Sequence, residues 1–118
     1  LELGSSGGAE IYRHLKDIFQ HVPKINREQV LALANHVSKE KKNDAFAIFS
    51  LILKQLVEGY VRNAALGINA QLMSLSNWLQ FQDFMNDELQ KAAGLNLEPR
   101  HVIIALFSQL AQLGRALT

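Results

Sequence analysis

Apolar residues recur at three- and four-residue spacing through most of the chain, and this periodicity is the feature that most restricts its fold. We expect helices over about residues 9–22, 26–38, 44–66 and 74–93, and a fifth helix from residue 96 or 98 onward. No segment shows the strict apolar and polar alternation that is typical of a half-buried strand. The sequence therefore predicts an all-α fold, a compact bundle of about five helices.

Residue types that are typical of helix ends stand between these segments. Asn26, with Gln29 three positions later, is typical of a helix start, because the asparagine side chain accepts hydrogen bonds from free backbone N–H groups. Either Ser74 or Ser76 is expected to begin the fourth helix in the same way. Three residues are expected to end helices, since proline disfavours helical backbone before it and glycine is common just after a last turn: Pro23, Gly67 and Gly94.

The composition excludes several classes of protein. Twelve basic and eleven acidic residues are interspersed and give a net charge of +1, so there is no basic stripe for direct nucleic-acid contact. No apolar run approaches the roughly 20 residues that span a bilayer, and we expect no membrane contact. The chain has no cysteine, which excludes disulfides and thiolate metal sites and fits a cytoplasmic protein.

The polar residues form no recognisable catalytic, cofactor or metal site. His14 and His21 lie on one flank of the first helix but are two turns apart, about 10.5 Å of rise, which is too far to bind one ion. Asp83 and Asp87 project away from the apolar face of the fourth helix and are expected to be solvated. The glycines and serines of residues 4–8 lack the lysine of a phosphate-binding loop. We therefore expect no enzymatic activity and no cofactor in this chain.

Two helices carry more apolar residues than one buried face needs. Ile48 and Leu51 fall outside the main apolar stripe of the third helix, and Ile104, Phe107 and Ala111 form a second face on the fifth. A helix that is apolar on two sides is either central in its bundle or buried against a partner. These five residues are the candidate subunit interface, and the core remains the alternative. The main buried face of the fifth helix is expected to consist of Val102, Ile103, Leu106, Leu110 and Leu113.

Short motifs along nearly the whole chain resemble one protein family. They are residues 4–9 (GSSGGA), 11–12 (IY), 30–34 (VLALA), 75–79 (LSNWL) and 95–100 (LNLEPR). On these segments the chain resembles the C-terminal part of the delta-prime subunit of the bacterial DNA polymerase III clamp loader. In this family, a helical collar domain joins subunits into the ring that loads the sliding clamp onto primed DNA during replication.

The resemblance implies a division of the chain and a set of partners. Residues 1–8 would be the end of a preceding lid domain or a linker, and residues 9–118 the collar, or oligomerisation, domain. ATP-hydrolysing relatives carry a nucleotide-sensing arginine where this chain has Gly7, so Gly7 would mark a degenerate sensor in a non-hydrolysing subunit of an ATP-dependent assembly. The expected partners are the collars of the motor and delta-type subunits.

Other interpretations of the same sequence remain open. Residues 4–7 are either native or partly derived from an expression tag. The bundle could instead be an unrelated helical adaptor domain that binds another protein, or a helical enzyme that depends on a metal or ligand.

Overall fold

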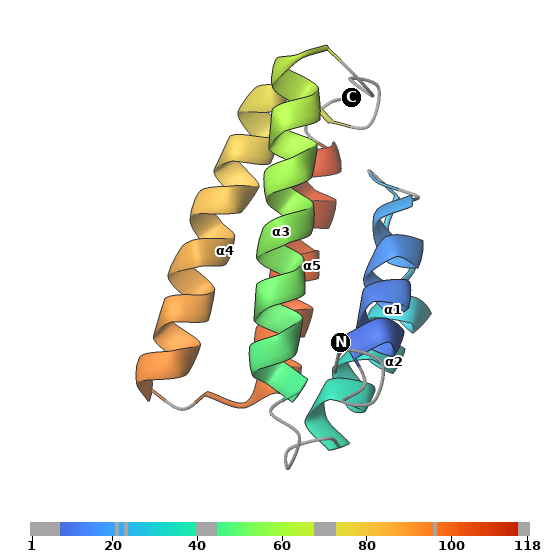
Figure 1. Cartoon of the computed structure of the whole chain (residues 1–118), viewed down its shortest axis with the longest axis vertical. Coiled ribbons are helices and arrows are strands. Elements are labelled where there is room, and N and C mark those ends of the chain that lie inside the picture. Colours follow the sequence, from blue (N-terminus) through green and yellow to red (C-terminus); the bar gives the residue numbers. More distant parts are fainter. Residues whose placement is uncertain are drawn as a thin grey trace.

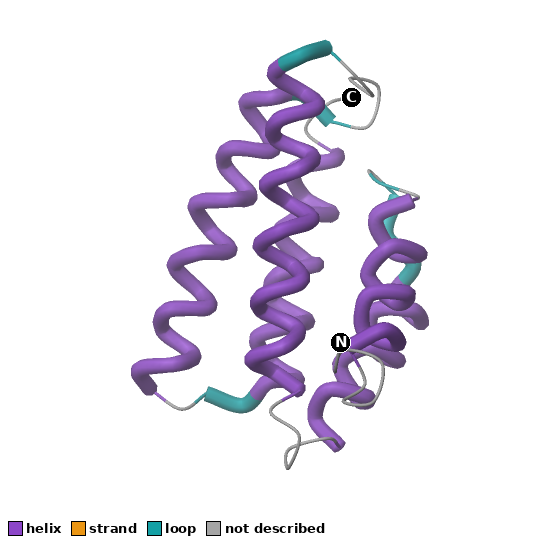
Figure 2. The backbone as a smooth tube through the Cα atoms, viewed as in Figure 1, coloured by secondary structure: helices purple, strands orange, loops and turns teal. Residues whose placement is uncertain are grey.

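Each amphipathic segment of the sequence forms one helix in the computed structural model, which describes residues 8–20, 22, 24–39, 45–67, 73–95 and 97–115. Within these residues Figure 2 shows only helices and the loops that join them. The expected all-α bundle of about five helices is confirmed. The helices are α1 (Gly8–Gln20), α2 (Arg27–Lys39), α3 (Ala45–Ala65), α4 (Leu75–Leu95) and α5 (Pro99–Arg115).

The helices form two groups that pack against each other. Helices α3, α4 and α5 lie side by side, and the shorter α1 and α2 lie together along one flank of them (Figure 1). The most extensive helix pairing joins α2 to α5, while α4 packs against both α3 and α5, and α1 against α3. Helix α5 is thus covered on two sides, by α2 and by α4. These two contacts determine which residues of its second apolar face are buried and which are exposed.

The starts of α2 and α4 follow from two polar side chains. The Oδ1 atom of Asn26 accepts hydrogen bonds from the backbone N–H groups of Glu28, at 2.9 Å, and Gln29, at 3.3 Å. The Oγ atom of Ser74 accepts one from the backbone N–H of Asn77 at 3.2 Å, so Ser74 and not Ser76 begins the helix. All three bonds satisfy N–H groups that a first helical turn leaves without a partner.

The helix ends agree less closely with the sequence prediction. Gly67 has a φ of +81°, the left-handed backbone that glycine adopts without steric cost, and it follows the end of α3 as expected. Gly94 does not end its helix, because α4 continues to Leu95. Helix α1 ends at Gln20, two residues earlier than expected, and Pro23 lies outside the described residues.

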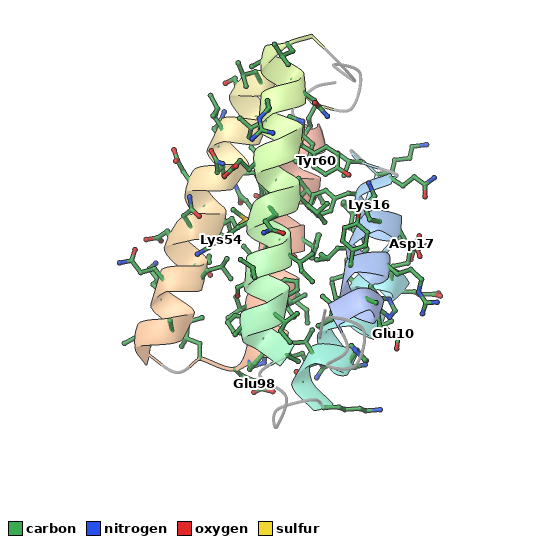
Figure 3. All side chains as sticks on the ribbon, in the orientation of Figure 1. Glu10, Lys16, Asp17, Lys54, Tyr60 and Glu98 are labelled. Atoms are coloured by element: carbon green, nitrogen blue, oxygen red, sulfur yellow. The ribbon has the colours of Figure 1, made fainter. Side chains whose placement is uncertain are left out.

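An aromatic cluster joins four of the five helices. The Tyr60 ring on α3 stacks on Trp78 of α4 with centroids 5.0 Å apart, and on Phe19 of α1 at 5.3 Å. Phe107 of α5 meets Phe19 edge-on at 5.7 Å. In Figure 3, Tyr60 lies on the side of α3 that faces α1, whereas Lys54 lies on the opposite side. Among the described residues no polar or charged residue is fully buried, so apolar packing holds the helices together.

One long-range hydrogen bond fixes the α4–α5 hairpin at its open end. The side-chain Nδ2 of Asn77, in the first turn of α4, donates to the carbonyl oxygen of Leu113 near the end of α5 at 3.1 Å. The bond joins the two ends of the hairpin that the connecting loop does not join, and it holds the two helices in register.

Candidate functional site

One hollow on the surface of the described residues is a groove between α2 and α5. It encloses about 350 Å³ and its walls are mostly apolar, with the polar side chains of Arg27 and Ser108 also lining it. We call it the α2–α5 groove. Its apolar lining comes from α2 and the turn before it, and from α5: Ile25, Val30, Leu31, Ile104, Phe107 and Ala111.

Three of the five residues predicted as subunit interface lie in this groove. Ile104 and Ala111 are partly exposed on its wall. Phe107 is only 1% exposed and belongs to the core, where it contacts Phe19. The sequence left two interpretations open for Phe107, core and subunit interface, and its burial favours the core.

The other two predicted residues lie on α3 and do not line the α2–α5 groove. Leu51 is 54% exposed, and Ile48 is partly buried against the core. A second apolar groove, of about 410 Å³, lies beside them between α1 and α3, and its walls include Tyr12, Ile52 and Leu56. The structure thus divides the five predicted residues between two helices instead of gathering them in one pocket.

Several exposed leucines were not predicted from the sequence. Leu79 of α4 is 43% exposed, and Leu75, one turn earlier on the same helix, is also exposed. Leu75 lies three residues before the buried Trp78 and Leu79 directly after it, but neither belongs to the buried face of α4. Their positions on the helix could therefore have indicated that they are exposed. Ile25, just before α2, lines the α2–α5 groove and is partly buried against the core.

The acidic residues of α4 behave as a solvated face. Asp83 and Asp87 are both exposed, and Asp87 pairs with Lys91 at 3.1 Å across one helical turn. The hydrogen bond that Lys91 donates to Asp87, followed by the charges of Asp87 and Glu88, raises the pKa of Lys91. Exposed pairs of this kind contribute little to stability.

The histidines meet across helices and not along one. His14 of α1 lies against His36 of α2, with ring centroids 5.9 Å apart, whereas His21 lies outside the described residues. Burial, and then the charge of His36, lowers the pKa of His14 from its ordinary value of 6.5. In the described part of the chain no three histidine or carboxylate side chains are grouped so that they could hold a metal ion.

The proposed sensor position cannot be placed. Gly7 falls outside the described residues, and Gly8, its neighbour, is already the first residue of α1 and is buried. None of the helices in the described ranges is long and apolar enough to cross a membrane.

Comparison with known proteins adds no relative. No protein-family model, no curated protein and no solved structure matches the chain. The case for a function therefore depends on the sequence motifs and on the surface of the molecule, where the α2–α5 groove is the candidate site.

Proposed function

We propose that this chain is a non-catalytic assembly module, the collar domain of a delta-prime-type subunit of the bacterial DNA polymerase III clamp loader. In that role it joins neighbouring subunits into the ring that loads the sliding clamp onto primed DNA. The observation that carries the proposal is the α2–α5 groove, on whose wall Ile104 and Ala111 of the interface predicted from the sequence are partly exposed. The resemblance of the short motifs to the family supports the same conclusion.

The chemistry of the groove suits a helix of another subunit. Apolar side chains of an amphipathic helix enter grooves of this kind, and Arg27 at the groove offers a charge for an acidic residue beside them. The net charge of +1 leaves no strong repulsion between protein surfaces.

Ring assembly also requires two separate contact surfaces on each subunit, since a subunit meets a different neighbour on each side. The α3 surface around Leu51, exposed and outside the α2–α5 groove, supplies a second candidate. The division of the predicted interface between α3 and α5 therefore fits a ring subunit.

Binding to the motor-subunit collar tests the proposal. The chain and the motor-subunit collar are mixed, and complex formation is followed by size-exclusion chromatography and calorimetry. Ala111→Glu places a charged side chain in the groove without removing an apolar contact, and we expect it to weaken binding at least about tenfold, which corresponds to about 1.4 kcal/mol. Ala93→Glu makes the same change at an exposed position of α4 and is expected to bind like the unchanged chain.

Two results would contradict the proposal. If the unchanged chain bound neither the motor-type nor the delta-type collar, the clamp-loader assignment would fail and an unrelated adaptor domain would be favoured. If Ala111→Glu bound as tightly as Ala93→Glu, the groove would not be the contact surface. We also expect no ATP hydrolysis by the chain alone, and turnover by the purified chain would refute its non-catalytic role.

A further inference from the structure

Two histidines from different helices share one partly buried contact. His14 projects from α1 and His36 from α2, and their rings are tilted by 39° at a centroid distance of 5.9 Å. Neither ring is fully exposed, and the Nε2 atom of His36 is buried without a hydrogen-bond partner. A neutral ring tolerates this arrangement, whereas a proton added at that buried nitrogen would form an N–H group with no acceptor.

The charged groups around His14 act on its protonation in opposite directions. His36 lies in the last turn of α2. His14 lies in the middle of α1, away from either helix end. Within α1 the nearby charged groups are Glu10 and Asp17, which favour a charged His14, and Arg13, which opposes it.

These carboxylates are poor counter-ions for His14. Glu10 is already paired with Arg13, and both Glu10 and Asp17 are exposed on the outer side of α1 (Figure 3). The other charged residues of the packed elements include Lys16 on α1, Arg27, Glu28 and Lys39 on α2, Lys54, Glu58 and Arg62 on α3, and Arg100 on α5, all of them exposed. Since Glu58 is paired with Arg62 at 3.4 Å, it too has a partner of its own.

We propose that the contact between His14 and His36 is a pH-sensitive device of the fold. It holds α1 against α2 while at least one imidazole is neutral, and it loosens when both rings carry a proton. Two positive charges in a partly buried contact repel each other more strongly than they would in water, because solvent screens them less. The proposal concerns the fold itself and does not depend on the partner of the α2–α5 groove.

The sign of the effect follows from proton linkage. Burial, followed by the charge of His36, lowers the pKa of His14 in the folded chain below the unfolded value of 6.5. Between these two values the unfolded chain binds more protons than the folded chain. The contact therefore contributes its full stability above about pH 6.5 and loses it as the pH falls through the pKa of folded His14.

A proton titration of the histidine rings by NMR tests the device directly. The titration is done with EDTA present, so that no metal ion bound to the rings imitates the effect. We expect His14 to titrate below 6.5, and His36→Gln to shift its midpoint upward because the neighbouring charge is gone. His101→Gln, a change at an exposed histidine on α5, is expected to leave the midpoint unchanged.

Thermal unfolding between about pH 8 and pH 5 supplies an independent measurement. The unchanged chain is expected to lose more stability on acidification than His14→Gln, and His101→Gln to behave like the unchanged chain. A His14 midpoint at or above 6.5, or equal acid sensitivity in the unchanged chain and His14→Gln, would overturn the proposal. The NMR result stands even if His14→Gln is too unstable to measure.

Discussion

Substitution of Phe107 tests whether the second apolar face of α5 belongs to the core. Its ring is 1% exposed and meets Phe19 edge-on at 5.7 Å, so Phe107→Ala removes a buried side chain and an aromatic contact. Truncation of a buried phenylalanine to alanine usually costs about 3–5 kcal/mol. Phe107 also borders the α2–α5 groove, so the space left by the ring would open toward water. We therefore expect the lower end of that range, about 3 kcal/mol.

Urea unfolding followed by far-ultraviolet circular dichroism measures this loss. For a domain of this size, about 3 kcal/mol corresponds to a decrease in Tm of roughly 12 °C, at about 4 °C per kcal/mol. Ile104→Ala is the matched control, because Ile104 lies in the same groove but is only partly buried, and we expect a smaller loss. If Phe107→Ala cost less than about 1 kcal/mol, or no more than Ile104→Ala, Phe107 would not be a core residue and the reasoning would be refuted.

Four further predictions concern the cap of α2, one glycine within α3 and one just after it, and the partly buried phenol of Tyr60. Asn26→Ala should cost about 1 kcal/mol by removing the cap of α2, whereas Asn35→Ala on the exposed face of α2 should be nearly neutral in urea unfolding. Gly67→Ala should cost about 1–2 kcal/mol because φ is +81°. In contrast, Gly59→Ala should add about 0.5–1 kcal/mol, since a Cβ there meets no atom within 4 Å. Burial, and then Tyr12, raises the pKa of Tyr60, so stability present below pH 10 should fall as the pH rises through the folded pKa, and Tyr60→Phe should lose less stability in alkaline unfolding experiments.

Local features of the fold could be predicted from the sequence because short-range physics determines them. Helical periodicity depends on residues three and four apart, and all five residues expected on the main face of α5 are buried. The caps at Asn26 and Ser74 follow from side chains that reach their own helix. Gly94 shows the limit of such signals, because α4 continues past it to Leu95.

Features that depend on which helices meet could not be predicted in this way. The second face of α5 was ambiguous between core and interface, and the position of α2 buries Phe107 while it leaves Ile104 and Ala111 partly exposed. The sequence pattern relates His14 only to His21, along the same helix. The ring that contacts His14 belongs instead to His36 of α2. The spacing of residues along the sequence does not indicate which side chains of α1 and α2 contact each other.

The pairing of α2 with α5 has a consequence for how the molecule acquires its surface during folding. Helices α3, α4 and α5 contact their sequence neighbours, and the Asn77–Leu113 bond completes the last hairpin. The α2–α5 contact instead joins segments far apart in the chain, and contacts of this kind carry the larger loop-closure cost. We expect α1 and α2 to dock last. The α2–α5 groove would then appear only at this final step, so that an incompletely folded chain could not engage a partner there.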